Sequence, residues 1–233
     1  AVKNKKVFHK NPDSWEIKME NFPKYVRRQN LTRFLALYEL YKKVIDVKGS
    51  VIECGVHNGF GVMTWAKLST ILEPYNYHRK IIGFDTFEGF KSIDKKDGPK
   101  SKELYDGALS VSKNYDVYLD KILQYHEQES PISHIKKFEI VKGDATEKIQ
   151  KYIEDNPQLI IAFAYFDFDI YKPTYTCLKT IKGCLTKGSI VGFDQLNDKV
   201  YPGETQALKE VFDLNNTQLE RSPYSAYQSY FVL

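Results

Sequence analysis

The chain alternates short apolar segments with segments of helical periodicity about five times, and this alternation constrains its fold more than any other feature. The apolar segments are SVIECGV (50–56), KIIGFDTF (80–87), FEIVKGD (138–144), LIIAFAYFDFD (159–169) and GSIVGFD (188–194). Continuous apolar runs of this length are typical of strands that are buried on both faces. The order therefore predicts an α/β fold, a doubly wound and mostly parallel sheet with helices on both sides.

The two ends of the chain add smaller elements. Residues 30–46 (NLTRFLALYELYKKVID) predict a helix, because apolar side chains recur there at helical spacing: Leu31, Phe34, Leu35, Tyr38, Tyr41, Val44 and Ile45. The final segments TQLERS and AYQSYFVL predict a C-terminal antiparallel hairpin. We therefore divide the chain into an N-terminal helical or lid segment (1–46) and an α/β domain (47–233).

Composition narrows the choice of partners. The 34 basic and 30 acidic residues leave a net charge of only +4, spread along the chain, which argues against nucleic acid as the partner. No apolar run reaches the length of a membrane span. The three cysteines have no paired spacing, so they are expected to be reduced thiols of a cytoplasmic protein, neither a disulfide framework nor a zinc site.

The first strand runs into a glycine-rich turn, SVIECGVHNGFG. Its glycines (Gly55, Gly59 and Gly61) give G-x-x-x-G-x-G, which departs from the G-x-G-x-x-G fingerprint of dinucleotide binding. The turn fits E-x-G-x-x-x-G, beginning at Glu53, and this wider turn leaves room for the methionine moiety of S-adenosylmethionine. Asp85, after the second strand, is placed to bind ribose hydroxyls, which both cofactors carry. A glycine-rich turn without a ligand is the alternative.

Acidic residues mark the ends of all five predicted strands: Glu53, Asp85, Asp144, the pair Asp167 and Asp169, and Asp194. The carboxyl ends of parallel strands meet at one edge of the sheet, where ligands of such folds bind. We therefore expect these carboxylates to face one crevice.

Four segments carry a family resemblance: VIECGVHNGFG, IIGFDTFEGF, YFDFDIYKPTYTCL and GSIVGFDQLND. They resemble the motif blocks of class I S-adenosylmethionine-dependent methyltransferases, most of all the macrocin O-methyltransferase type, which methylates sugar hydroxyls on natural products. The match spans residue 48 to about residue 213. The resemblance implies a Rossmann-like methyltransferase domain over 47–233, S-adenosylmethionine as cofactor, and a small-molecule acceptor such as a sugar or a nucleotide-linked sugar.

The resemblance also implies roles for individual residues. Gly55 and Gly59 would pass close to the cofactor, Asp85 (with Glu88 as an alternative) would bind ribose, and Asp144 would meet the adenine amine. Glu53, the acid of the E-x-G-x-x-x-G turn, is also expected to bind the cofactor. The expected cofactor-binding residues are therefore Glu53, Gly55, Gly59, Asp85 and Asp144.

A magnesium site is implied at the ends of the fourth and fifth strands. The family has two adjacent acids after the fifth strand, whereas this chain has Asp194 followed by Gln195. Asp167, Asp194 and Gln195 are the expected ligands, and because an amide contributes no charge, the metal requirement stays open. Asp167 is expected to be the catalytic base, a metal ligand, or both. Asp169 is expected to cap the following helix, near whose start Pro173 lies.

Three functions remain open from the sequence: an O-methyltransferase of a sugar or similar hydroxyl, a methyltransferase of another acceptor, and a non-catalytic protein of the same fold. The acceptor is expected to be set by the N-terminal segment and by the polar stretch 88–110. That stretch is either a lid or a solvated insertion, and a homo-oligomeric state is left open.

Overall fold

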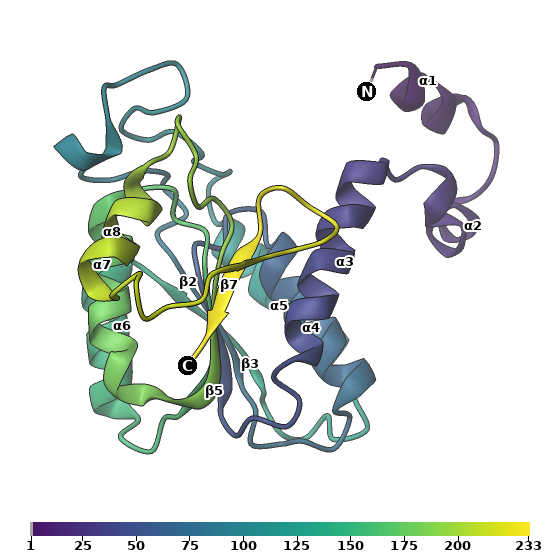
Figure 1. The fold of residues 1–233 in the computed structure, drawn as a ribbon. Helices are drawn as coiled ribbons and strands as arrows, with labels where there is room; N and C mark the ends of the chain where they lie inside the picture. The colour runs from purple at the N-terminus through teal and green to yellow at the C-terminus, as the bar shows by residue number, and fades with distance from the viewer. Residues whose placement is uncertain (1) are drawn as a thin grey trace.

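The computed structural model describes residues 2–233 and contains one seven-stranded sheet with the strand order β3-β2-β1-β4-β5-β7-β6 (Figure 1). The parallel strands are β1 (Ser50–Cys54), β2 (Ile81–Asp85), β3 (Phe138–Lys142), β4 (Ile161–Phe166) and β5 (Leu185–Phe193). The strands β6 (Glu220–Arg221) and β7 (Ser229–Val232) form an antiparallel hairpin, and β7 pairs with β5. The predicted Rossmann-like, mostly parallel sheet with a C-terminal hairpin is confirmed.

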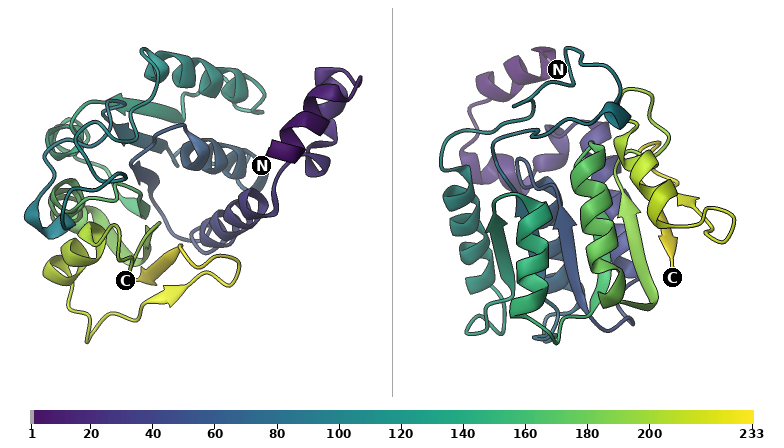
Figure 2. Two further views of the ribbon diagram at one scale, coloured as in Figure 1. Left: turned by 90° about the horizontal axis from the view of Figure 1, so that it is seen from above. Right: turned by 90° about the vertical axis from the view of Figure 1, so that its left-hand side faces the viewer.

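Helices cover both faces of the sheet (Figures 1 and 2). On one face lie α3 (Arg28–Lys42), α4 (Phe60–Leu72) and α5 (Tyr115–Gln128), and on the other lie α6 (Ala145–Asp155), α7 (Tyr171–Ile181) and α8 (Gly203–Val211). Each face of the sheet packs against its helices to form a separate hydrophobic core. Successive strand residues point to opposite faces, so Phe163 packs in the core beneath α3, α4 and α5, and Ala164 packs in the core beneath α6, α7 and α8. This explains why the sequence of the central strand β4, IAFAYF, is apolar throughout.

The helix predicted over 30–46 exists as α3, but its buried face differs from the predicted one. The buried residues are Ala36, Leu37, Leu40 and Tyr41 within the helix and Val44 just after it. Phe34 and Leu35, which were assigned to the apolar face, are 36% and 40% exposed. Apolar residues occur on more than one face of this helix, so the sequence does not identify the buried face. The buried face is the one that contacts α4 and the sheet.

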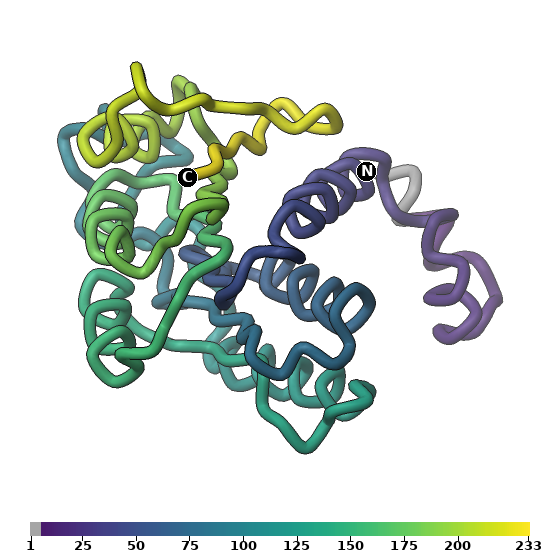
Figure 3. The backbone as a smooth tube through the Cα atoms, turned by 60° about the horizontal axis from the view of Figure 1, so that its bottom comes forward, coloured from purple at the N-terminus to yellow at the C-terminus, as the bar shows by residue number. Residues whose placement is uncertain are grey.

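The N-terminal helices α1 (Val2–Lys10) and α2 (Trp15–Glu20) stand away from the sheet, joined to α3 through a 3₁₀ turn at Phe22–Lys24 (Figures 1 and 3). Ser14 caps α2, because its Oγ accepts a hydrogen bond from the Ile17 N–H at 3.4 Å. An N-terminal helical segment was expected. The boundary at residue 46 stays a prediction, because α3 packs into the same core as α4.

Two findings bear on the predicted environment of the protein. Across residues 2–233, no helix is both long and apolar enough to cross a membrane. The thiols of Cys54, Cys177 and Cys184 are all free, and the first two are buried.

The stretch 88–110 is packed rather than freely solvated. Phe90, Leu104 and Ala108 form a small apolar cluster with Ile170, at the start of α7. The backbone of the stretch also closes on itself, because the Phe90 N–H donates to the Ala108 carbonyl at 2.9 Å. Asp97, only 2% exposed, accepts a hydrogen bond from the Tyr171 N–H at 2.5 Å. The stretch is therefore anchored to the N-terminus of α7.

We expect Asp97→Ala to lower the free energy of unfolding by about 0.5–2 kcal/mol, the usual cost of losing a helix cap. Amide hydrogen exchange should speed up in 88–110, because the anchor to α7 is lost. Urea unfolding and exchange mass spectrometry measure the two effects. Asp106→Ala is the matched control, since Asp106 in the same stretch forms an exposed ion pair with Lys100. Equal exchange in the two variants would contradict the anchoring role.

Candidate active site

A cleft opens at the carboxyl ends of β1, β2, β3 and β4, with an empty volume of about 710 Å³ that includes space open to solvent. Its wall includes six residues from these strand ends and the turns that follow: Gly55, His57, Asp85, Asp144, Asp167 and Asp169. Phe90, Lys91 and Ser92 of the anchored stretch also line it. Four of the residues predicted to form the site, Gly55, Asp85, Asp144 and Asp167, thus share one cleft.

Asp85 holds the glycine-rich turn in place. Its Oδ2 accepts hydrogen bonds from the Val56 and His57 N–H groups, each at 2.7 Å. Its Oδ1 accepts from the Phe87 N–H at 2.6 Å. The carboxylate therefore ties the turn after β1 to the end of β2 and fixes the floor of the cleft. Binding of ribose by Asp85 stays a prediction. The ribose hydroxyls would donate to carboxylate lone pairs that these three hydrogen bonds leave unused.

Gly55 lies where β1 and β4 end side by side. Its φ is +100°, and a Cβ built on it would lie 2.1 Å from the Asp167 carbonyl oxygen. Only glycine adopts this conformation and permits this approach without strain. The position therefore fits a backbone cradle for a cofactor, which any side chain would disturb.

Gly59 and Glu53 lie outside the cleft wall. Gly59 precedes the first residue of α4 and faces Leu119. Glu53 is buried beneath the turn, where a Cβ on Gly61 would come within 1.6 Å of its Oε1. Burial raises the pKa of the Glu53 carboxyl well above its usual range. A cofactor-binding role for both residues stays a prediction.

Asp144 caps the N-terminus of α6 and lines the cleft. Its Oδ1 accepts hydrogen bonds from the Thr146 N–H at 2.9 Å and the Thr146 hydroxyl at 2.7 Å. Its second oxygen is left for a donor such as the predicted adenine amine. Glu88, the alternative ribose ligand, is an exposed residue paired with Lys91.

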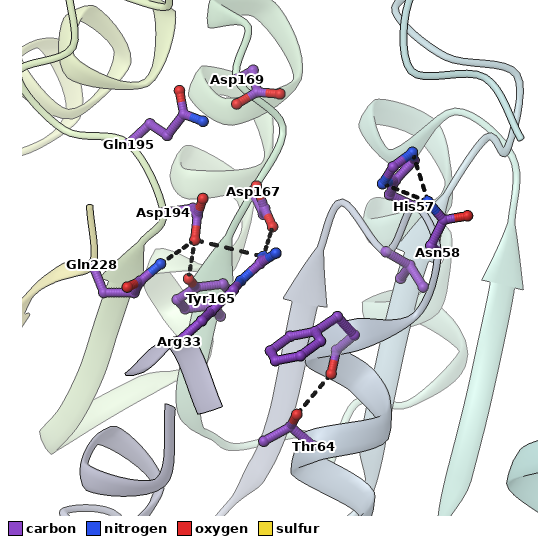
Figure 4. Close-up of polar contacts among 12 residues, drawn as sticks. Arg33, His57, Asn58, Thr64, Tyr165, Asp167, Asp169, Asp194, Gln195 and Gln228 are labelled. Atoms are coloured by element: carbon purple, nitrogen blue, oxygen red, sulfur yellow. Dashed lines mark hydrogen bonds and ion pairs between the residues drawn. The ribbon is translucent and has the colours of Figure 1, made fainter. Parts of the chain in front are cut away.

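Beside the cleft, a guanidinium joins the acids that end β4 and β5 (Figure 4). The Nη2 of Arg33, on α3, lies 2.8 Å from Asp167 Oδ2 and 3.6 Å from Asp194 Oδ1. The same Asp194 oxygen accepts hydrogen bonds from the Tyr165 hydroxyl at 2.7 Å and from the Gln228 amide at 2.5 Å. Asp167 and Asp194 are therefore brought together, as predicted, but around a cation that the protein itself supplies.

Asp169 does not cap α7, so that prediction is wrong. The residue before the helix is Ile170, and the first helical N–H bonds to Asp97. Asp169 is 5% exposed, has a left-handed φ of +62°, and its Oδ1 has no hydrogen-bond partner within residues 2–233. Burial and the nearby Asp194 raise the pKa of Asp169 to about 7. It is a carboxyl held toward the cleft with an open oxygen.

The unusual backbone at Asp169 has a buried support. Glu204, at the start of α8, accepts hydrogen bonds from the Phe168 N–H at 3.0 Å and the Asp169 N–H at 3.2 Å. Glu204 is 0% exposed, and burial raises its pKa well above the usual range. Left-handed backbone at a non-glycine residue costs about 1–3 kcal/mol and persists where the surroundings enforce it. Glu204 therefore positions Asp169.

The residues expected to bind magnesium do not fit that ion as they are arranged. Arg33 lies between Asp167 and Asp194, and the Gln195 side chain lies apart from their contacts, with a buried Oε1 that bonds to no described group (Figure 4). Within the described chain, no group of three or more His, Cys, Asp or Glu side chains is placed to hold a metal ion.

Five residues of this region were missed from the sequence: Arg33, Asp97, Tyr165, Glu204 and Gln228. Of these five, only Arg33 could have been recognised from the sequence. It lies one helical turn before Leu37 and in register with Leu40 and Val44, so it is a charged residue on the buried stripe of α3. Such a position calls for a buried acidic partner.

Neither a family model nor a curated protein sequence matches the chain, but solved structures do. A calicheamicin methyltransferase, CalS11, is 37% identical, with a TM-score of 0.95 over 99% of this chain and 90% of that one. The chain belongs to the class I S-adenosylmethionine-dependent O-methyltransferases. An apo structure of CalS11, described as a TDP-rhamnose 3'-O-methyltransferase, is 34% identical, with a TM-score of 0.86 over 99% of this chain and 91% of that one.

A more distant member shares the fold alone. The O-methyltransferase NovP is 15% identical, with a TM-score of 0.65 over 86% of this chain and 79% of that one. The family membership confirms the resemblance to the macrocin O-methyltransferase type and makes the chain an enzyme, so the non-catalytic alternative is set aside.

For this methyltransferase we expect Asp85→Ala to weaken binding of S-adenosylhomocysteine by about 1.5–3 kcal/mol, the worth of charge-assisted hydrogen bonds. The loss arises because the glycine-rich turn is no longer held by the bonds to Val56 and His57. Isothermal titration measures the affinity, and Asp116→Ala, which removes an acid paired with Lys142 away from the cleft, is the control. Unchanged affinity in Asp85→Ala, or micromolar binding of NADH, would contradict the assignment.

Proposed function

We propose that this O-methyltransferase methylates a hydroxyl group of a sugar, and that the sugar is presented as a nucleotide-linked derivative. The observation that carries the proposal is the likeness to CalS11, a TDP-rhamnose 3'-O-methyltransferase, over nearly the whole of both chains. The acids that meet at the cleft supply the chemistry that an aliphatic hydroxyl needs.

The cleft contains features that suit the cofactor. Gly55 offers a backbone surface without a side chain, Asp85 fixes the turn, and Asp144 presents an unfilled oxygen. S-adenosylmethionine supplies an activated methyl group, whose bond to the sulfonium sulfur breaks as a bond to the acceptor oxygen forms. The protein then has two tasks, to align the acceptor and to take up its proton.

Asp169 is the stronger candidate for the base. It lines the cleft, is buried, and keeps an open oxygen, whereas Asp167 is already paired with the Arg33 guanidinium. A carboxyl whose pKa lies near 7 is suited to take a proton near neutral pH. We assign proton uptake to Asp169 and leave Asp167, the base predicted from the sequence, as the competing candidate. No step of this proposal passes through a metal ion.

The test is a screen of acceptors with purified enzyme and S-adenosylmethionine. TDP-sugars, the corresponding free sugars, a catechol and an amine are compared, and products are identified by mass spectrometry and by NMR of the new methoxy carbon. Methylation of a TDP-sugar hydroxyl in preference to the free sugar is the expected result. Methylation of the amine alone, or of the catechol alone, would overturn the proposed acceptor class.

A further inference from the structure

Arg33 comes from outside the segments that define the family resemblance, yet it reaches the centre of the site. It lies on α3, whereas the resemblance begins at residue 48. Its guanidinium lies over the Phe60 ring, with 4.8 Å from Cζ to the ring centroid, and this cation–π contact helps to hold it in place. It points from there between Asp167 and Asp194 (Figure 4).

One oxygen of Asp194, Oδ1, has little room for another cation. It already accepts hydrogen bonds from Tyr165 and Gln228 and lies 3.6 Å from the Arg33 Nη2. Magnesium requires near-octahedral oxygen ligands at about 2.0–2.1 Å. An ion bound to this oxygen would have to displace at least part of that arrangement, and the guanidinium first.

Gln195 also makes the site less suitable for a divalent cation. The acid that the family places there would add a negative charge, and the amide adds none. One charge is thus missing from the expected ligand set, and the positive charge of Arg33 lies beside the two remaining carboxylates. Gln195 and Arg33 come from separate parts of the chain, and each disfavours a divalent ion.

We propose that Arg33 takes the place of the divalent cation between Asp167 and Asp194, so that this enzyme needs no added metal. Arg33 is a positioning residue, since it holds Asp167 at the cleft wall and balances the charge of both acids. The turnover part of this inference rests on the proposed function, whereas the metal-binding part does not.

The first experiment measures metal binding without any acceptor. Enzyme freed of metal with EDTA is titrated with Mn²⁺, followed by electron paramagnetic resonance and calorimetry. The wild-type protein is expected to show no specific site. Arg33→Met, which removes the guanidinium from both carboxylates, should gain Mn²⁺ affinity by roughly 10- to 100-fold. Arg28→Met is the matched control, because Arg28 is exposed at the start of the same helix.

Binding of S-adenosylhomocysteine to each variant shows whether the cleft is intact, and it does not depend on the acceptor. A wild-type site that binds Mn²⁺ tightly would overturn the inference, and so would an intact Arg33→Met protein that gains no affinity. These binding measurements remain valid even if no sugar acceptor is methylated. A failure of the proposed function can therefore be distinguished from a failure of this inference.

The second experiment uses turnover with the acceptor found in the screen. The wild-type rate is expected to be the same in EDTA and in Mg²⁺. Arg33→Met should lower kcat by roughly 100-fold, as expected when reacting groups are misplaced, and Arg33→Lys should restore part of the loss. Inactivation of the wild-type enzyme by EDTA, reversed by Mg²⁺, would overturn the inference.

Discussion

Asp169→Asn is expected to lower kcat by roughly 10²- to 10⁴-fold, the usual worth of a positioned general base, with less than about a twofold change in S-adenosylhomocysteine affinity. The substitution keeps the shape of the side chain and removes its capacity to take up a proton. It leaves intact the backbone bonds that Asp169 and Phe168 donate to Glu204. Single-turnover measurements with the sugar acceptor separate the chemical step from product release.

The competing candidate gives the matched comparison. In Asp167→Asn, an amide oxygen still accepts a hydrogen bond from Arg33, so the arrangement beside the cleft is retained. We expect a loss of roughly tenfold for this variant, from weaker positioning and not from a missing base. The reverse order, with Asp167→Asn inactive and Asp169→Asn nearly unaffected, would assign the base to Asp167. Asp155→Asn, at a surface ion pair with Lys151, should be silent.

The sequence located the cleft because topology alone places it. Strands that are apolar on both faces had to be parallel and covered by helices, and their carboxyl ends had to share one edge. Gly55, Asp85, Asp144 and Asp167 all end up there. Positions of this kind follow from the order of elements and require no knowledge of side-chain contacts.

The contacts between those residues were not predictable in the same way. Arg33 and Asp167 are 134 residues apart in the chain, and only the packing of α3 on α4 brings them together. The sequence predicts Asp169 as a helix cap, because nothing in the motif D-F-D indicates that Asp169, its third residue, has a left-handed backbone. That conformation depends on Glu204, from a helix whose sequence resembles any amphipathic surface helix.

The packing of the stretch 88–110 was not predictable for another reason. Its polar and charged residues concealed a cluster of Phe90, Leu104 and Ala108, which are spaced with no helical or strand period. Periodicity detects regular elements, and it misses a loop that forms a small core against a neighbouring helix. The loop could be recognised only with its partner, Ile170, in view.

Gly55→Ala is expected to have the largest effect on stability. The new methyl group would lie 2.1 Å from the Asp167 carbonyl oxygen and 2.6 Å from its carbonyl carbon, at a backbone φ of +100°. Left-handed strain costs about 1–3 kcal/mol, and overpacking costs a further ~1–3 kcal/mol. Unfolding should therefore become easier by about 2–6 kcal/mol, a large share of the roughly 5–15 kcal/mol of a typical domain.

The clash at Gly55 has no inexpensive relief, because both backbones are held. The Gly55 N–H donates to the Phe84 carbonyl at 3.0 Å, and the Asp167 N–H donates to the Cys54 carbonyl at 2.8 Å. Moving either strand end would also move the cleft wall, so S-adenosylhomocysteine binding should fall together with stability. Gly107→Ala separates the two causes, since Gly107 has a φ of +87° but nothing within 4 Å of its added Cβ. Urea unfolding should show only the strain cost there. Equal losses in the two variants would mean that the close approach of β1 and β4 contributes nothing, and the cradle assigned to Gly55 would then be wrong.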